Sequence, residues 1–288
     1  MLMLPLVPRE RVLDRIACPG CRSRLDDFPA PTLLVCRSCQ AEYPQTTDLW
    51  ADCRPAAWRS PEPTWKGRQD EMESAYADLI ADPDHARQAY RNDLEPLRPL
   101  FTRLGSRVLD VGGGNGLLRH VLEPATDYVA VDPSPLWLDS RWLAIADAFP
   151  CLRAPLAFVG GVGEHLPFPD GAFDAVTSVW SLNHSARPSA VIGEVRRVLA
   201  PRGEFVLVLD DVAPRWSDLA AGRYADFRYP TRLGLLRARA AALVKGWPRQ
   251  PDHLPIAERE LKGWTVGLRR IGRGFAGSYL WLRYERRG

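Results

Sequence analysis

The stretch VLDVGGGNG at residues 108–116, followed by YVAVDPS at residues 128–134, decides the fold of this chain. Each half is an apolar strand that ends in a turn rich in glycine or polar residues. Glycine permits a sharp turn and lets a ligand lie directly against backbone N–H groups. Asp132, at the end of the second strand, can accept hydrogen bonds from both hydroxyls of a ribose. The two halves therefore predict a nucleoside-binding pocket at the carboxyl ends of two parallel strands.

The spacing of the glycines narrows the choice of ligand. Residues 112–116 read GGGNG, which is GxGxG rather than the GxGxxG of dinucleotide-binding proteins. No Lys-Ser/Thr pair follows, so a phosphate-binding P-loop is excluded. Asp110, just before the glycines, can bind an ammonium group or orient the loop. The pattern favours a cationic ligand that bears an amino acid over a pyrophosphate.

Three more blocks follow in order: GEHLPFPDGAFDAV at 163–176, VWSLNH at 179–184 and EVRRVLAPRGEFVLVL at 194–209. Together with the glycine turn they resemble the class I S-adenosylmethionine-dependent methyltransferases, in particular the type 11 group. The resemblance implies an α/β fold with a Rossmann-like sheet, parallel except for one antiparallel strand near the C-terminus. It also implies S-adenosylmethionine as the cofactor. The glycine turn would then hold its methionine part, and Asp132 its ribose.

The block at 163–176 would carry the adenine edge, with one departure from the family pattern. The family usually has an Asp shortly before the Glu of this block, and Val162 stands in that place. In our interpretation backbone groups near Gly163 and Glu164 replace the missing side chain. The predicted cofactor-binding residues are Asp110, Gly112, Gly114, Gly116, Asp132, Gly163 and Glu164.

Four cysteines near the N-terminus, Cys18, Cys21, Cys36 and Cys39, form the pattern C-x2-C-x14-C-x2-C. Two pairs of thiolates can close a tetrahedral site of four sulfurs, the geometry that structural zinc prefers. Two disulfides are the competing interpretation, which is disfavoured because no signal peptide precedes the cysteines. The segment at 36–50 also resembles the small zinc-ribbon activator proteins found beside or fused to methyltransferases. We therefore expect an N-terminal ribbon with structural zinc.

The length of 288 residues suits one α/β domain plus a small ribbon. We expect the ribbon at 1–50, a linker and lid helices at 51–104, and the methyltransferase domain at 105–288 with an insertion at 213–260. Helices are expected at 71–80, 85–104 and 233–244, periodic helices between the strands of 107–209, and two final strands joined by a glycine turn at 272–274. The first residues, MLMLPLVPRERVL, are too short and too interrupted by proline for a signal peptide or a membrane span. We therefore expect a cytoplasmic protein.

The candidate catalytic residues follow the two strands that should face the methyl group. Methyl transfer from a sulfonium depends mainly on placing the acceptor in line with the methyl carbon, with a base where the acceptor bears a proton. His184 is the first candidate for that base, because an imidazole titrates near neutrality, and packing or helix capping is its alternative role. Asp210 is the second candidate. Tyr76 and Tyr90 would belong to the lid or to ordinary packing.

Three functions fit these residues. The first is methylation of a small metabolite enclosed by the segments at 51–104 and 213–260. The second is methylation of an RNA base, because the order of the parts resembles the bacterial 23S rRNA guanine-N1 methyltransferases, whose second knuckle usually carries a His. The third, a non-enzymatic partner protein with the same fold, is disfavoured by the intact glycines and acids. The aromatic residues expected to enclose a metabolite are Trp58, Trp65, Trp216, Phe227, Tyr229 and Trp247.

The charge of the C-terminal third bears on the choice between metabolite and RNA. Residues 215–288 carry sixteen Lys and Arg against six Asp and Glu. Such a surface can bind phosphates, and a solvated surface in an Arg-rich chain is the alternative. The aromatic residues are spaced among Pro and Gly, without a regular basic stripe. We therefore favour a small-molecule substrate over RNA, and no membrane partner.

Overall fold

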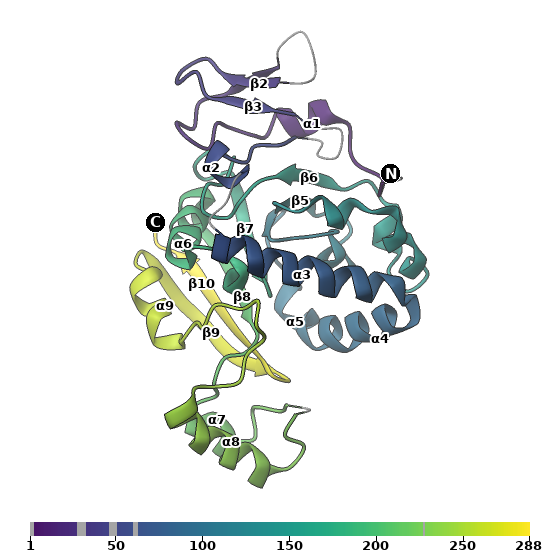
Figure 1. Cartoon of the computed structure of the whole chain (residues 1–288). Helices are drawn as coiled ribbons and strands as arrows, with labels where there is room; N and C mark the ends of the chain where they lie inside the picture. Colours follow the sequence, from purple (N-terminus) through teal and green to yellow (C-terminus); the bar gives the residue numbers. More distant parts are fainter. Residues whose placement is uncertain (1–2, 28–32, 46–50, 60–62, 227) are drawn as a thin grey trace.

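The computed structural model describes residues 3–27, 33–45, 51–59, 63–226 and 228–288 (Figure 1). They form a seven-stranded sheet in the order β6-β5-β4-β7-β8-β10-β9 and a separate three-stranded sheet in the order β1-β2-β3. Within this part of the chain, no helix is both long and apolar enough to cross a membrane.

The seven-stranded sheet comprises β4 (Arg107–Val111), β5 (Asp127–Asp132), β6 (Ala157–Gly160), β7 (Phe173–Val179), β8 (Leu199–Leu209), β9 (Leu268–Ala276) and β10 (Tyr279–Arg286). Strands β6, β5, β4, β7 and β8 pair in parallel. Strand β10 lies between β8 and β9 and is antiparallel to both. The predicted α/β class is confirmed: this is a Rossmann-like methyltransferase sheet with one antiparallel strand near the C-terminus.

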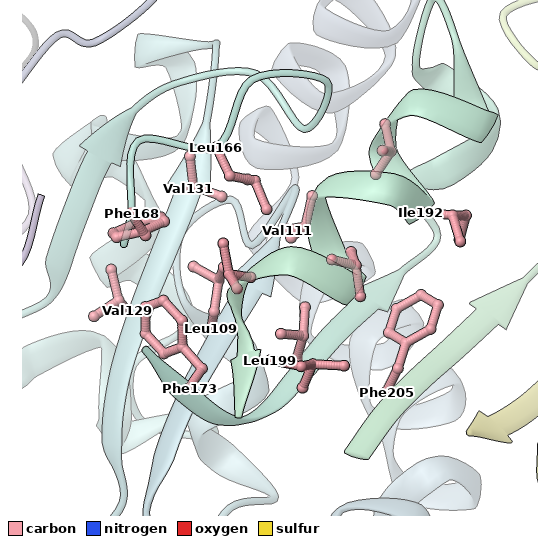
Figure 2. Packing of buried hydrophobic residues seen from close by; sticks show 14 of the residues in the cluster. Leu109, Val111, Val129, Val131, Leu166, Phe168, Phe173, Ile192, Leu199 and Phe205 are labelled. Carbon is pink, nitrogen blue, oxygen red and sulfur yellow. The ribbon is translucent and has the colours of Figure 1, made fainter. Parts of the chain in front are cut away.

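The central strands are apolar on both faces because both faces are covered. Successive side chains of a strand point to opposite faces, so Leu109 and Val111 of β4 join one core, whereas Val108 joins the other. Figure 2 shows the first of these cores, where β4 and β5 pack against Phe168 and against Ile192 of the helix that follows β7 in the chain. Parallel strands buried in this way are near-continuous hydrophobic runs.

The connections after β4 and β5 differ from the periodic helices expected there. They are short 3-10 segments, and the residues at 112–126 leave too little chain for both a glycine turn and a full helix. Helix α6 (Pro188–Val198) is the α-helical crossover, with Val191, Ile192, Val195 and Val198 on its buried face. The 3-10 segments are η2 (Leu117–His120), η3 (Pro135–Leu138), η4 (Ser140–Ile145), η5 (Pro150–Arg153) and η6 (Leu182–His184).

The lid helices begin earlier than the sequence predicted. Helix α3 (Pro63–Ala81) crosses the front of the sheet, and α4 (Pro83–Leu94), η1 (Glu95–Leu97) and α5 (Arg98–Phe101) follow it (Figure 1). The break between α3 and α4 has a local cause: Asp82 accepts a hydrogen bond from the His85 backbone N–H at 3.0 Å and caps α4. Prolines in η1 and α5 divide the segment that was expected as one helix at 85–104.

The N-terminal region contains α1 (Arg9–Leu13), β1 (Leu25–Asp27), β2 (Leu33–Cys36), β3 (Glu42–Pro44) and α2 (Ala56–Arg59). It is attached to the edge strand β6. The Cys53 N–H donates to the Gly160 carbonyl at 2.7 Å, and the Gly160 N–H donates to the Ala51 carbonyl at 2.8 Å. These bonds cover the open edge of the sheet. Val12 and Ile16 pack into the same hydrophobic core as the sheet, so the region is joined to the larger domain by packing as well.

The predicted glycine turn at 272–274 is wrong, because those residues lie inside β9. The hairpin turn between β9 and β10 is at Gly277, whose φ is +61°. Trp281 of β10 explains the two glycines: a Cβ on Gly274 would lie 2.6 Å from its ring, and one on Gly272 would lie 2.9 Å from it. Helices α7 (Trp216–Ala220), α8 (Arg232–Lys245) and α9 (Glu258–Trp264) precede this hairpin, and α7 and α8 lie at the end of the molecule opposite the ribbon (Figure 1).

We expect Gly274→Val to destabilise the protein by about 1–3 kcal/mol, because the added side chain must displace the Trp281 ring. Gly193→Ala is the matched control. A Cβ at that position of α6 meets nothing within 4 Å, so the change should be neutral or stabilise the helix by up to about 1 kcal/mol. Urea unfolding followed by tryptophan fluorescence measures both changes. Equal stability of the two variants would contradict the packing of Trp281 on Gly274.

Candidate functional site

A pocket lies at the carboxyl ends of β4, β5 and β7. Its wall includes the glycine turn, Asp132, the segment at 161–164, the segment at 178–185 and the inner face of α3. It encloses about 1080 Å³ of empty space, including the part open to solvent. The sheet order reverses at β4, since β5 lies on one side of it and β7 on the other. Ligands of open α/β sheets bind at such a switch point.

The glycine turn needs glycine for steric reasons. Gly112 and Gly114 both line the pocket, and their φ values are +72° and +51°, a region that favours glycine. A Cβ on Gly112 would lie 2.2 Å from the Ser181 Cβ, and one on Gly114 would lie 3.0 Å from the Trp137 ring. Gly116 also has a positive φ, but it packs against Leu156 and is not part of the pocket wall.

Asp132 is buried on the pocket wall at the end of β5. Its carboxylate accepts a hydrogen bond from the Ser134 backbone N–H at 2.9 Å. Burial raises the pKa of Asp132 to about 7, although hydrogen bonds from the backbone N–H groups of Ser134 and Gly114 oppose that change. The carboxyl group is therefore about half protonated at neutral pH in the absence of a ligand.

Asp110 is buried near the end of β4 and joins the neighbouring strands. The Tyr128 hydroxyl on β5 and the Thr177 hydroxyl on β7 each donate to one of its carboxylate oxygens at 2.7 Å. Burial raises the pKa of Asp110 to about 6, and the two hydroxyl hydrogen bonds lower it. The two roles expected from the sequence, loop orientation and binding of an ammonium group, stay predictions. The side chain still forms part of the pocket wall.

Gly163 and Glu164 lie on the far wall of the pocket. Gly163 is wedged between Val191 and Val111, where a Cβ would approach their methyl groups to 3.0 and 3.1 Å. Glu164 caps the start of α6, because its Oε1 accepts from the Ala186 and Arg187 backbone N–H groups at 2.8 and 3.0 Å. Val162, the residue before them, presents an apolar, buried side chain to the pocket. It stands where the sequence comparison led us to look for an Asp.

Helix α3 forms the lid of the pocket. Trp65, Gln69, Met72 and Tyr76 repeat at intervals of four, three and four, which places them on one helix face, and all four line the cavity. The Trp65 indole N–H donates to the His184 carbonyl at 2.9 Å and fixes the start of the helix. The sequence prediction named Trp65 and Tyr76 separately and did not include Gln69 and Met72. The spacing of the four residues could have indicated that they share one helix face. Tyr90 of α4 also lines the pocket.

Three buried donors on the pocket wall have no partner in the described part of the chain. They are the Asn115 side-chain amide, Nδ2, and the indole nitrogens, Nε1, of Trp137 and Trp180. A buried donor without a partner costs about 1–3 kcal/mol. A ligand with oxygen or nitrogen acceptors would offset that cost.

His184 and Asp210 follow β7 and β8 respectively, and His253 lies between them. The His253 Nε2 is 3.6 Å from an Asp210 oxygen, and its ring is edge-on to that of His184 at 4.6 Å between centroids. Burial, and then the neighbouring His253, lower the pKa of His184 to about 4, so its imidazole is unprotonated. Burial raises the pKa of Asp210 to about 6. The sequence prediction missed His253, which lies far along the chain and in no recognisable motif.

The four cysteines predicted to bind zinc lie together. The Cys18 and Cys39 sulfurs are 3.6 Å apart, the Cys21 and Cys36 sulfurs are 3.3 Å apart, and all four ligand atoms lie within 4.8 Å of one another. A disulfide needs about 2.05 Å, and sulfurs about 2.3 Å from one zinc ion would be separated by ~3.8 Å. The Tyr43 hydroxyl is 3.2 Å from the Cys18 sulfur and can donate to it.

The aromatic residues of the insertion do not enclose the pocket. Tyr229 and Trp247 pack with Tyr224 in a separate hydrophobic cluster around α7 and α8. Trp216 is 46% exposed and stacks with Arg239. Of the residues expected to enclose a substrate, Trp65 lines the pocket, Trp58 packs against it, and Phe227 lies outside the described residues.

The profile described as "Methyltransferase domain" matches residues 109–207. That segment runs from β4 to β8 and carries most of the pocket wall. The segment is similar to the methyltransferase domains that this profile describes.

Curated relatives that match this part of the chain include enzymes named for small substrates. The fatty-acid O-methyltransferase of Mycolicibacterium smegmatis is 34% identical over 173 residues, which are 56% of this chain and 58% of that protein. The demethylmenaquinone methyltransferase of Beutenbergia cavernae is 30% identical over 175 residues, which are 60% of this chain and 65% of that protein. The chain thus spans little more than half the length of the curated relatives that it matches.

Solved structures with a similar domain include a methyltransferase from Aquifex aeolicus. It has 16% identity, covers 71% of this chain and 98% of its own, and superimposes with a TM-score of 0.47. A methyltransferase from Thermotoga maritima, described as a possible histamine N-methyltransferase, has 17% identity, covers 77% and 99%, and gives a TM-score of 0.46. The order and direction of the strands, rather than these superpositions, define the fold of the present domain.

We expect Asp110→Ala to destabilise the protein by about 2–4 kcal/mol, because it leaves the Tyr128 and Thr177 hydroxyls buried without their acceptor. Asp110→Asn keeps one acceptor oxygen and should cost less. Urea unfolding at pH 8, without any ligand, measures the difference. Unchanged stability of the Ala variant would mean that the carboxylate serves a ligand and not the fold.

Proposed function

We propose that this chain is an S-adenosylmethionine-dependent methyltransferase. The observation that carries the proposal is the pocket at the switch point of the sheet, in which the glycine turn and Asp132 face the lid helix α3. The unpartnered donors of Asn115 and Trp137 on the same wall fit a ligand rich in oxygen and nitrogen acceptors. Gly112 and Gly114 line the pocket, where a ligand can lie against their main chain.

Each part of the cofactor has a counterpart among the pocket residues. The backbone at Gly112 and Gly114 would hold the methionine part, and Asp132 would accept hydrogen bonds from the ribose hydroxyls. The backbone around Gly163 would meet the adenine edge, since Val162 has no polar side chain to offer. When bound, the cofactor supplies an electrophilic methyl group. The chain's own residues orient it, and α3 excludes water from it.

The acceptor would approach from the ends of β7 and β8, beside His184 and Asp210. We infer that the acceptor is a small molecule, because α3 covers the pocket and leaves limited room for an acceptor beside the cofactor. The relatives named for a fatty acid and a quinone favour a small, lipophilic acceptor.

RNA as the acceptor is less well supported, because many arginines of the basic C-terminal third are already paired. Arg215 and Arg273 pair with Glu258, and Arg273 also pairs with the buried Asp218. Similar pairs join Arg228 to Asp226, Arg269 to Glu285 and Arg283 to Glu204. An arginine held in this way is a poor phosphate ligand, so the charge excess overstates the free basic surface.

The affinity for S-adenosylmethionine should fall below pH 7. Burial raises the pKa of Asp132 to about 7 in the free protein, and the ribose hydroxyls need the charged carboxylate as their acceptor. Below that pKa the proton must first be lost, so the affinity should drop by up to about tenfold per pH unit and level off above it. Calorimetric titration over about three pH units around the pKa, from roughly pH 5.5 to 8.5, measures this dependence.

Asp132→Ala should weaken binding by roughly 2–4 kcal/mol at pH 8, since it removes two charge-assisted hydrogen bonds. It should also abolish the step near pH 7. Asp147→Ala, at an exposed acid of the same domain, is the control and should bind like the parent protein. Undiminished affinity in Asp132→Ala would refute the assignment of the ribose site.

We also propose that residues 1–50 form a ribbon with one structural zinc ion held by Cys18, Cys21, Cys36 and Cys39. Four thiolates close a tetrahedral site and leave no open position for catalysis. The short distances between their sulfurs support this donor set. A four-thiolate site also suits the reducing cytoplasm, where we place the protein.

The purified protein should contain about one equivalent of zinc per chain. Cys36→Ser should lose the metal and lower the thermal stability, because zinc binding contributes directly to the folding of such ribbons. Cys151→Ser, at a free thiol outside the cluster, is the control and should keep the zinc. Elemental analysis and a thermal melt measure both effects. Disulfides among the four cysteines, without metal, in protein prepared under reducing conditions would contradict the zinc site.

A further inference from the structure

A second cluster of metal-ligand side chains lies at the acceptor end of the pocket. Two histidines, His184 and His253, and three carboxylates, Asp210, Asp211 and Asp252, converge there from η6, from the end of β8 and from the segment before α9. The ligand atoms of His184, Asp252 and His253 all lie within 4.8 Å of one another, and so do those of Asp210, Asp211 and His253. His253 therefore joins the two groups.

The hydrogen bonding of His253 points its free nitrogen at two carboxylates. Its Nδ1 lies 2.9 Å from an Asp211 oxygen. The opposite nitrogen, Nε2, lies 3.6 Å from Asp210 and 3.8 Å from Asp252. Both distances are too long for hydrogen bonds. Two ligands of one cation, with bonds of about 2.1 Å, are separated by about 3.0–3.4 Å, so a bound cation would draw these oxygens slightly closer to Nε2. Burial lowers the pKa of His253, but the hydrogen bond to Asp211 and the surrounding carboxylates raise it overall.

The other residues of the cluster are arranged in the same way. The His184 Nδ1 is buried without a hydrogen-bond partner in the described part of the chain, and it lies 3.4 Å from the same Asp252 oxygen. The Asn183 amide donates to Asp210 at 2.7 Å and holds that carboxylate in place. A ligating histidine supported by a carboxylate, and a ligating carboxylate supported by a hydrogen bond, are typical of protein metal sites.

The charges of the cluster leave room for a cation. Three carboxylates lie within one buried region, where each side chain is less than one-sixth exposed. Arg228 reaches Asp211 at 3.4 Å, but its guanidinium is mainly engaged by Asp226 at 2.7 Å. Buried carboxylates are stabilised by pairing or by metal coordination. A divalent cation supplies that compensation at the centre of the group.

We propose that His184, Asp252 and His253 bind one divalent transition-metal cation, with Asp210, Asp211 and Asn183 beside it. Two imidazoles and one carboxylate suit Mn²⁺ or Zn²⁺, because imidazole favours the transition metals and carboxylate admits the harder ones. The site is distinct from the four cysteines of the ribbon, which are soft ligands.

The location of the cation gives it a role, which rests on the proposed methyl transfer. His184 belongs to both the cluster and the pocket wall. Three protein ligands leave three positions of an octahedral ion open, and the pocket side is the one that a substrate can reach. The acceptor class is therefore a molecule that reacts through a carboxylate or hydroxyl oxygen. The cation would orient that oxygen toward the methyl group.

Titration of the zinc-loaded full-length protein with Mn²⁺ alone tests the site. Electron paramagnetic resonance reports free Mn²⁺, and its signal should show one saturable site per chain without cofactor or acceptor. His253→Ala and Asp252→Asn should each weaken Mn²⁺ binding at least about tenfold, and Asp211→Asn about 10–100-fold. His85→Ala removes an exposed imidazole of α4 and should leave the binding unchanged.

Thermal melts and S-adenosylmethionine affinity of the same variants show whether they are folded. Loss of Mn²⁺ binding in folded Asp252→Asn, with the cofactor affinity retained, supports the metal site. Absence of a saturable site in the parent protein, or equal binding by Asp252→Asn and the parent, overturns it. The proposed cofactor site is judged separately, because failure of cofactor binding would leave the Mn²⁺ titration unaffected.

Discussion

The hydrogen bonds to Asp110 are the constraint on which the pocket depends. They join three neighbouring strands, because Tyr128 near the start of β5 and Thr177 within β7 both donate to the carboxylate on β4. The chain then turns at once, and the Gly112 N–H donates to the Val131 carbonyl at 2.8 Å. The turn and the end of β5 are thereby fixed side by side. The other parts of the pocket wall, the segment at 178–185 and helix α3, face this turn.

The charged forms of the two buried carboxylates beside this turn are unfavourable when no ligand is present. Burial raises the pKa of Asp110 to about 6 and that of Asp132 to about 7. Each pKa unit corresponds to about 1.4 kcal/mol between the two protonation states, so both charged carboxylates cost several kcal/mol in the empty pocket. A ligand with positive charge and hydroxyl donors would lower both pKa values. The two raised pKa values therefore indicate that this part of the pocket favours a ligand with positive charge or hydrogen-bond donors.

The sequence predicted those parts of the fold whose causes are local. The glycine turn, Asp132, the buried strands and the helix at 232–245 follow from short-range patterns, and the structure has them. The sequence-based prediction misplaced those features whose causes lie elsewhere in the chain. The glycines at 272–274 signalled a turn, but they serve the Trp281 ring on the neighbouring strand. His253 was missed because only the folded chain brings it between His184 and Asp210, and no spacing in the sequence encodes that meeting.

The ribbon and the pocket are connected through one arginine. Arg54 follows the segment that covers the edge of β6, and its guanidinium binds the Asp52 carboxylate at 2.8 Å and the Pro133 carbonyl at 3.2 Å. Pro133 is the residue after Asp132, so this arginine holds the linker to the loop that follows β5. Bonds from residues 51–53 hold the same segment to Gly160, next to Gly161 of the far pocket wall. The N-terminal region therefore contacts two of the segments that shape the pocket, although it contributes no residue to the described pocket wall.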